Sequence, residues 1–136
     1  IETACRKGAP ESTLRVGRSQ IAQLRGLLAS RSGDVERARS HFRTAAELAP
    51  AWAGPWVNLG VLSETREEFE DARECYERAL SIEPGHPVAL YNSARLHARM
   101  GRLAPARERI AKLLAVVPDY PGGRELEARV RQEEPA

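Results

Sequence analysis

Three prolines recur at a fixed interval along the chain. Pro50, Pro84 and Pro118 stand 34 residues apart. Proline lacks a backbone N–H and clashes with the preceding turn, so it ends a helix rather than continuing one. A helix stop at constant spacing indicates a chain built from copies of one structural unit. No other feature of this sequence constrains the fold as strongly.

Five further positions keep an apolar character at the same interval. The columns are Val35, Phe69 and Leu103; Ala38, Ala72 and Ala106; Phe42, Tyr76 and Ile110; Ala45, Ala79 and Leu113; and Leu48, Ile82 and Val116. Within the second copy, these residues are separated by three or four positions, which is the spacing of a half-buried helix. One such helix cannot cover its own apolar face, so neighbouring copies are expected to stack.

The second copy resembles the tetratricopeptide repeat family. The pattern of that family is W-x2-L-G-x2-Y, then A-x3-F-x2-A, then P, on a helix-turn-helix unit. The matching residues here are Trp56, Leu59, Gly60, Ala72, Tyr76, Ala79 and Pro84, with Ser63 at the Tyr position. The resemblance extends from about residue 19 to about residue 120. It implies an all-α, right-handed solenoid of antiparallel helix pairs, with three repeats and a C-terminal capping helix.

The period and the turn residues predict the limits of these elements. Repeats are expected at 19–52, 53–86 and 87–120, their first helices at about 19–32, 53–66 and 87–100, and their second helices at about 35–48, 69–82 and 103–116. Gly33 and Gly101 fall between the two helices of a repeat, where a left-handed residue commonly ends the first helix. Glu67 occupies this position in the second repeat, where a left-handed backbone would cost about 1–2 kcal/mol.

The two ends depart from the period. Residues 1–10 contain Gly8 and Pro10 and predict a mobile tail. An early start of the first helix, near Ser12 and within residues 1–18, is favoured by four apolar residues: Leu14, Ile21, Leu24 and Leu28. Residues 121–136 are expected to form a capping helix and a C-terminal tail. In that helix, apolar side chains would face the last repeat and charged side chains would face water. The whole chain is expected to form one domain.

Composition limits the partners and the compartment. The net charge is +2 with both signs interspersed, whereas nucleic-acid binding needs a clustered basic face. No apolar run reaches the length of a membrane span, so we expect a soluble chain, in the cytoplasm or, if a leader was removed, in the periplasm. Arg-rich, Lys-poor usage is typical of high-GC bacterial sequences, and a start at Ile1 favours a fragment or a processed form. Cys5 and Cys75 do not make a disulfide framework.

No arrangement of residues indicates catalysis. His41, His86 and His97 are the only histidines, and their expected positions do not share a face. The chain has neither a nucleophile elbow nor a glycine-rich phosphate loop. The acidic run at residues 67–71 suits a helix N-terminus, where negative charge is favourable, better than an acid–base pair. We therefore expect no enzyme, no cofactor and no metal site.

The resemblance implies that the first helices of the repeats line a concave groove that holds a peptide or partner segment. Asn58 and Asn92 are 34 residues apart and would occupy the same place in successive helices. An Asn side chain can donate to and accept from an extended backbone. The alternative is that Asn is simply a polar residue that is frequent at this position.

Arg95 and Arg99 are one helical turn apart and could hold an acidic side chain of a partner, unless both are only solvated surface residues. Tyr91, Val61 and Leu27 complete the predicted groove contacts, and Glu64 falls at another groove-facing position. The charged positions of the family's carboxylate clamp fall on Gln23, Val88 and Asn92, so binding of a chaperone tail is not expected.

The sequence thus predicts a non-catalytic protein–protein interaction module. Two alternatives stay open. The chain could be a self-assembling scaffold, or it could be an accessory domain of a larger enzyme or of a secretion or assembly complex. The sequence does not identify the partner.

Overall fold

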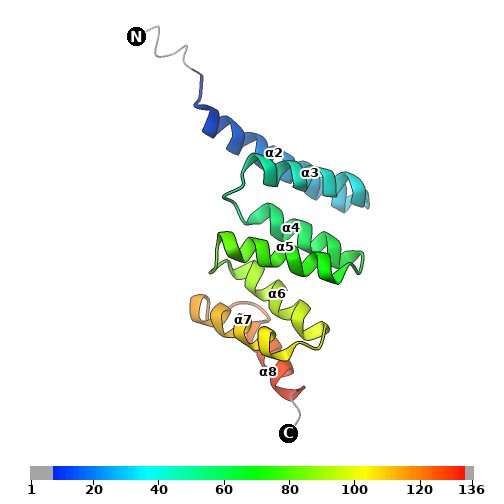
Figure 1. The fold of residues 1–136 in the computed structure, drawn as a ribbon, viewed down its shortest axis with the longest axis vertical. Helices are drawn as coiled ribbons and strands as arrows, with labels where there is room; N and C mark the ends of the chain where they lie inside the picture. The colour runs from blue at the N-terminus through cyan, green and yellow to red at the C-terminus, as the bar shows by residue number, and fades with distance from the viewer. Residues whose placement is uncertain (1–7, 134–136) are drawn as a thin grey trace. The chain divides into compact units, whose positions relative to one another are not determined.

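The computed structural model describes residues 8–133, and all regular structure in this part of the chain is helical (Figure 1). The chain divides into two compact units, Ile1–Ala51 and Trp52–Ala136. Within residues 8–133, the first unit contains α2 (Glu11–Arg31) and α3 (Val35–Leu48), and the second contains α4 (Gly54–Thr65), α5 (Phe69–Ile82), α6 (Pro87–Arg99), α7 (Leu103–Val116) and α8 (Gly123–Gln132). The grouping of all repeats into one domain and the repeat limits stay predictions.

The helices follow the predicted spacing closely. α3, α5 and α7 cover the ranges predicted for the second helices, and each ends two residues before its proline. α2 is longer than the predicted 19–32, because it begins at Glu11 directly after Pro10. This start lies one residue before Ser12, near which the sequence predicts that the helix begins. Of the predicted tail at residues 1–10, only residues 8–10 lie in the described part of the chain, and Cys5 lies outside it.

Close helix crossings are built from a glycine on one helix and an aromatic ring on the next. In the second unit, a Cβ atom on Gly60 would stand 2.4 Å from Cε1 of Tyr76. In the first unit, a Cβ on Gly26 would stand 2.5 Å from Cε1 of Phe42. Both rings are fully buried or nearly so. Because glycine has no side chain, the ring lies directly on the helix backbone. This explains why the repeat pattern has a glycine at this position.

The turns between paired helices use a left-handed residue in all three repeats. Gly33 and Gly101 have φ values of 81° and 74°. Glu67 adopts φ 61° at the same place, and it is the only non-glycine residue with positive φ among residues 8–133. The next helix is capped in the first repeat, where the Asp34 side chain accepts a hydrogen bond from the Arg37 backbone N–H at 3.2 Å. The second repeat therefore keeps the left-handed turn although Glu67, rather than a glycine, occupies it.

Replacing Glu67 by Gly is expected to raise the free energy of unfolding by about 0.5–1 kcal/mol. Gly removes the strain energy of the left-handed backbone, and this gain is larger than the stability lost because Gly raises the conformational entropy of the unfolded chain. The reverse change, Gly101→Glu, should lower stability by a similar amount, because a Cβ there meets no atom within 4 Å and only the backbone is strained. Urea denaturation followed by circular dichroism measures both. Equal and unchanged midpoints for the two variants would contradict this account of the turn.

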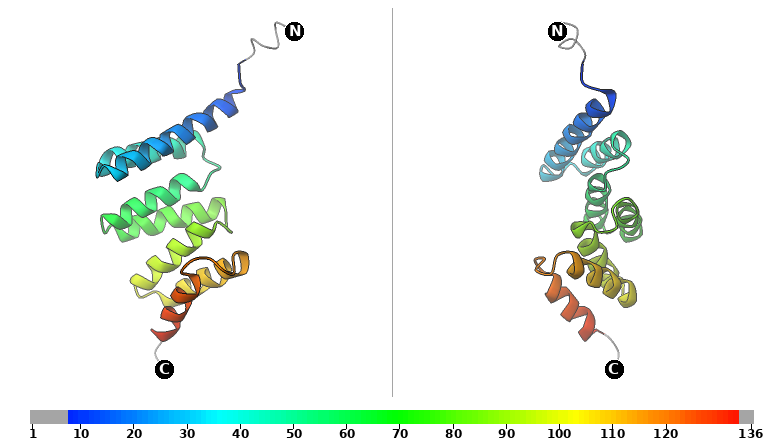
Figure 2. Two further views of the ribbon diagram at one scale, coloured as in Figure 1. Left: turned by 180° about the vertical axis from the view of Figure 1, so that it is seen from behind. Right: turned by 90° about the vertical axis from the view of Figure 1, so that its left-hand side faces the viewer.

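The last helix covers the end of the second unit. α8 buries Gly123, Leu126 and Val130, and Leu126 and Val130 join a core cluster with Ala106 and Ile110 of α7. Figure 2 shows α8 alongside the α6–α7 pair. Its other side chains are mostly charged and exposed. α8 lies within the predicted 121–136, and its buried apolar residues Leu126 and Val130 face the last repeat, as expected for a capping helix.

Candidate functional site

Most of the side chains predicted to contact a partner lie on two helices of the second unit. α4 and α6 are in contact, and they carry the residues that are called here the α4/α6 surface: Asn58, Val61, Tyr91, Asn92, Arg95 and Arg99. Leu27 is an exposed residue of α2 in the first unit. The structure therefore brings six of the seven predicted residues onto one pair of helices.

A buried carboxylate lies beneath this surface. The Glu64 side chain on α4 is only 7% exposed. The Tyr76 hydroxyl donates a hydrogen bond to Glu64 Oε1 at 2.7 Å. Arg95 Nη2 donates to Oε1 at 3.3 Å and to Oε2 at 3.4 Å, and Arg99 Nη1 donates to Oε2 at 3.5 Å. A carboxylate can be buried at acceptable cost only when charged partners and hydrogen bonds surround it, as they do here.

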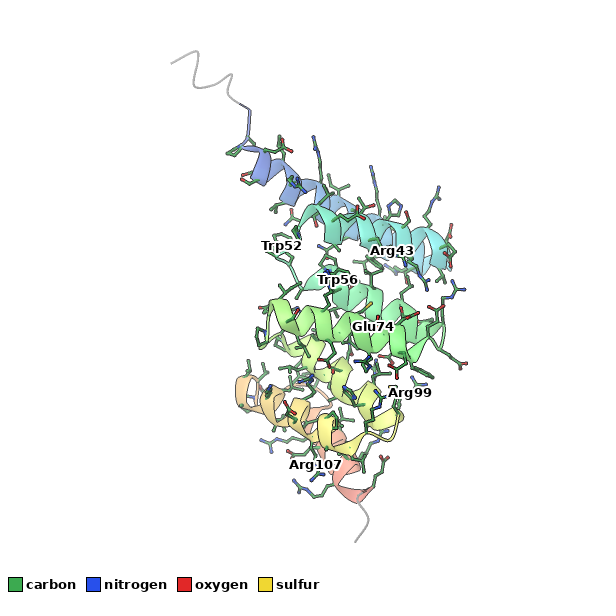
Figure 3. The ribbon with its side chains drawn as sticks, in the orientation of Figure 1. Arg43, Trp52, Trp56, Glu74, Arg99 and Arg107 are labelled. Atoms are coloured by element: carbon green, nitrogen blue, oxygen red, sulfur yellow. The ribbon has the colours of Figure 1, made fainter. Side chains whose placement is uncertain are left out.

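Arg95 and Arg99 therefore already bind an acidic group, and that group belongs to the chain itself. Both guanidinium groups remain partly exposed, and one carboxylate opposite two of them leaves one positive charge in excess. Arg99, labelled in Figure 3 at the end of α6, also lies 4.8 Å from the centre of the Phe69 ring. Such stacking fixes the direction of a guanidinium. The pair is thus held in place and retains charge toward solvent.

The hydrogen bond from Tyr76 depends on a protonated hydroxyl. Burial raises the pKa of the Tyr76 phenol, and the hydrogen bond to Glu64 raises it further. The hydroxyl is therefore a permanent donor at any physiological pH. Glu64 Oε1 therefore accepts from both Tyr76 and Arg95, while Oε2 accepts from Arg95 and Arg99.

The two asparagines differ in exposure. Asn58 is half-buried, whereas Asn92 is only 7% exposed. Asn92 lies on α6, which contacts four helices: α4, α5, α7 and α8. These contacts cover more of the α6 side chains than contact with α4 and α5 alone would. Of the two positions, Asn58 is therefore the more accessible. Tyr91 is also half-buried, with its ring centre 5.2 Å from that of Tyr120 in the turn before α8.

A second group of charged residues joins α5, α6 and α7. Arg109 Nη2 donates to both oxygens of Glu77 at 2.7 Å. His97 Nε2 lies 3.6 Å from Glu77 Oε1, which is too long for a hydrogen bond. Both ring nitrogens of His97 are buried without a hydrogen-bond partner. Burial lowers the pKa of His97, outweighing its attraction to Glu77. The imidazole is thus a neutral packing residue at the position of the family's Tyr.

Acidification below pH 6.5 is expected to destabilise the chain through His97. Its ordinary pKa of 6.5 applies to the unfolded state, so the unfolded chain takes up a proton that the folded chain resists. The contribution of neutral His97 to the free energy of unfolding is fully present above pH 6.5. It is lost as the pH drops toward the lower pKa of His97 in the folded chain. Replacing His97 by Phe should flatten this profile and, because it removes two unpartnered nitrogens, add about 1 kcal/mol at neutral pH.

Urea denaturation at about pH 7.5 and about pH 5.5 measures this effect above the range in which carboxylates titrate. A matched His41→Phe variant, on α3 of the first unit, should retain the wild-type loss of stability. If His97→Phe loses as much stability as the wild type on acidification, the assignment of the effect to His97 is wrong.

The ion pairs between repeats were not predicted. Glu64 pairs with Arg95, Glu70 with Arg102 at 2.8 Å, and Glu77 with Arg109. In each of these pairs, and in the pair of Glu64 with Arg99, the acid comes from the second repeat and the base from the third, at sequence separations of 31 to 35 residues. The signal in the sequence is opposite charges spaced by about one period. These pairs can be recognised in the sequence only once it is known which side chains of one repeat face the next repeat.

The described residues offer little chemistry beyond these contacts. Residues 8–133 contain no group of three or more His, Cys, Asp or Glu side chains placed to hold a metal ion. In the same part of the chain, no helix has both the length and the apolar composition that crossing a bilayer requires. The α4/α6 surface therefore presents amide, guanidinium and apolar groups, which are suited to contact with another polypeptide.

Comparisons with known sequences agree with the helical repeats. Residues 19–51 and residues 65–130 each match a family model described as "Tetratricopeptide repeat". An uncharacterized protein of Methanocaldococcus jannaschii is 35% identical over 69 residues, which is 51% of this chain and 80% of that protein. A tetratricopeptide repeat-containing protein of Caenorhabditis elegans is 30% identical over 86 residues, or 63% of this chain and 11% of that protein.

A probable biofilm formation methyltransferase of Pseudomonas putida is 40% identical over 76 residues, which is 56% of this chain and 18% of the enzyme. The chain thus spans under a fifth of the length of the worm protein and of this enzyme.

Two solved structures share the fold. The tetratricopeptide repeat domain of Arabidopsis OM64 matches with a TM-score of 0.79 at 18% identity, over 88% of this chain and 99% of that one. The first such domain of Spaghetti (RPAP3), bound to the HSP90 peptide SRMEEVD, matches with a TM-score of 0.82 at 12% identity, over 86% of this chain and 95% of that one. These likenesses confirm the predicted all-α solenoid of helical repeats.

Proposed function

Because the chain belongs to the tetratricopeptide repeat family, we propose that it is a non-catalytic interaction module that binds an extended segment of a partner protein on the α4/α6 surface. The observation that carries this proposal is the charge on that surface. Arg95 and Arg99 are anchored by the buried carboxylate of Glu64 and keep one positive charge in excess toward solvent. An acidic side chain of a partner is the group that this arrangement attracts.

The remaining groups of the surface suit an extended backbone. Asn58 offers an amide that both donates and accepts hydrogen bonds. Val61, at 41% exposure, is an apolar contact on the same helix. The proposed ligand is therefore an extended segment with at least one acidic residue near an apolar one. The ligand carboxylate would bind the same two guanidinium groups as Glu64. Because Glu64 already holds these groups in position, less entropy is lost when the ligand binds.

The proposed binding mode differs from recognition of a free C-terminus. In this chain, Gln23 and Val88 occupy charged positions of the family's carboxylate clamp. We therefore expect the free C-terminal carboxylate of a peptide such as SRMEEVD to contribute nothing, so its free and amidated forms should bind alike. An internal acidic residue is the group that the Arg pair would bind.

One observation favours a second candidate role. The Pseudomonas enzyme matches this chain over only 18% of its length, so a segment of this kind occurs inside a larger methyltransferase. The same binding surface could then serve as an accessory region within a larger enzyme. A separate interaction module and an accessory region would bind a partner through the same contacts. They differ only in whether an enzyme domain is part of the same polypeptide.

The test is selection of a ligand by the intact chain. A random peptide library displayed on phage is panned against the immobilised chain, and selected peptides are measured by fluorescence anisotropy. We expect enrichment of Asp and Glu. Arg99→Ala should weaken binding by about tenfold or more, which corresponds to loss of one charge-assisted hydrogen bond. Arg124→Ala removes an exposed Arg of α8 and is the matched control.

The asparagines are tested in the same assay. Asn58→Ala together with Asn92→Ala should weaken binding by several-fold to about tenfold, the size of one or two neutral hydrogen bonds. Unchanged affinity in this double variant would show that the Asn pair does not contact the ligand. Peptides without acidic enrichment, or equal losses for Arg99→Ala and the Arg124→Ala control, would overturn the proposed use of the Arg pair.

A further inference from the structure

The first unit carries an apolar stripe that its own structure leaves uncovered. Five large apolar side chains of α2 are exposed, Leu27 among them. The other four, at 41%, 50%, 61% and 63% exposure, are called here the α2 stripe: Leu14, Ile21, Leu24 and Leu28. Their spacing of seven, three and four residues places them along one side of the helix. The residues that α2 buries, Ser19, Ala22, Gly26 and Ala29, lie on a different side. Within the first unit, α3 therefore covers one face of α2 and leaves the apolar stripe on another face uncovered.

The period of 34 residues shows what normally covers such a stripe. Ile21 and Leu28 correspond to Ala89 and Leu96 on α6, which are completely buried. Ala89 and Leu96 share a core cluster with Ala79 and Leu80 of α5, the second helix of the preceding repeat. The α2 stripe is thus built to receive an amphipathic helix that packs as α5 packs on α6.

The charges next to the stripe indicate the chemistry of that helix. On α2, Arg18 and Arg25 flank one side of the stripe and Arg31 flanks the other, and all three are exposed. The only acidic residue of α2 is Glu11, in its first turn. In the second unit, the covering repeat supplies the acids and the covered repeat supplies the bases, as in Glu64 of α4 with Arg95 of α6 and in Glu77 of α5 with Arg109 of α7. A helix that covers α2 should likewise be acidic at its flanks.

We propose that the α2 stripe is a docking surface for an acidic amphipathic helix of a partner protein. A second copy of this chain fits less well for two reasons. Pairing of α2 with α2 would bring Arg18 and Arg25 of both copies together, and like charges across an interface are costly. Stacking of α2 on the other end of a copy would meet the charged outer side of α8, whose apolar residues Leu126 and Val130 are already buried.

Two designed helical peptides test this proposal with the full chain. Both are as long as α5 and carry an apolar stripe of α5 type, one flanked by Glu and the other by Lys at the same positions. Fluorescence anisotropy should show saturable binding of the Glu-flanked peptide and at least about tenfold weaker binding of the Lys-flanked one. No binding of the Glu-flanked peptide, or equal binding of both, would overturn the proposal.

Variants on the exposed surface identify the site. Ile21→Ser with Leu28→Ser should abolish binding, whereas Val88→Ser, which alters an exposed apolar residue of α6, should leave it unchanged. Arg18→Glu with Arg25→Glu should reverse the preference in favour of the Lys-flanked peptide. Circular dichroism confirms that each variant is folded. If light scattering instead shows a dimer of the chain that Ile21→Ser with Leu28→Ser dissociates, the occupant is a second copy and the proposal is wrong.

Discussion

Replacing Tyr76 by Ala is expected to lower the free energy of unfolding of the second unit by about 3–5 kcal/mol, the usual loss for a large buried aromatic side chain. The ring is 0% exposed and lies in the main core cluster of the unit, against the backbone at Gly60. The substitution also removes the donor to the buried Glu64 carboxylate. Urea denaturation followed by circular dichroism measures the loss.

Tyr76→Phe separates the two contributions. It keeps the ring and removes only the hydroxyl, so it should cost about 1–3 kcal/mol, the penalty for leaving Glu64 with one donor fewer. If Tyr76→Phe were as damaging as Tyr76→Ala, the hydrogen bond rather than the ring would hold the helices together. If both were harmless, the crossing of α4 and α5 would not depend on this residue at all.

Adding a single methyl group at Gly60 is expected to destabilise the chain by about 1–3 kcal/mol, the usual cost of overpacking a core. The new Cβ would stand 2.4, 2.7 and 2.9 Å from three carbons of the Tyr76 ring. The ring cannot easily withdraw, because its hydroxyl is fixed to Glu64 at 2.7 Å. This loss outweighs the gain of up to about 1 kcal/mol that Ala brings to a helix in place of Gly.

Gly17→Ala is the matched control for Gly60→Ala. Gly17 is also inside a helix, α2, but its added Cβ meets no atom within 4 Å. The control should therefore stabilise α2 by up to about 1 kcal/mol, so the two substitutions differ in sign. A gain of stability in both would show that the helices of the second unit can separate at this crossing at little cost.

Much of the fold could be predicted because it depends on local signals. α3, α5 and α7 each end two residues before a proline, and the proline acts through its own missing N–H. The glycine–aromatic crossings could also be predicted, since Gly60 and Tyr76 lie in one repeat and their roles follow from size. The length of α2 was harder to set, because no repeated residue marks where it begins.

The site could be predicted only in part, because its electrostatics depend on contacts between repeats. Arg95 and Arg99 were placed correctly on one face of α6, yet their partner Glu64 is 31 and 35 residues away in sequence. Nothing near Glu64 in sequence shows that it is buried. The low exposure of Asn92 has a similar origin, because α6 contacts four helices. Residue type indicates the chemistry of a side chain, and stacking decides its access to a partner.

The most direct test of the proposed binding surface uses the chain's two asparagines, Asn58 and Asn92, which are the only ones it contains. A chain labelled with ¹⁵N only at the side-chain amide of Asn shows these two groups in an otherwise empty NMR spectrum. On titration with an acidic peptide selected by the chain, the Asn58 amide is predicted to shift saturably, with the same midpoint as in anisotropy, and Asn92 is predicted to follow. A peptide that binds with full affinity while both amides stay unmoved would contradict the placement of the ligand on the α4/α6 surface.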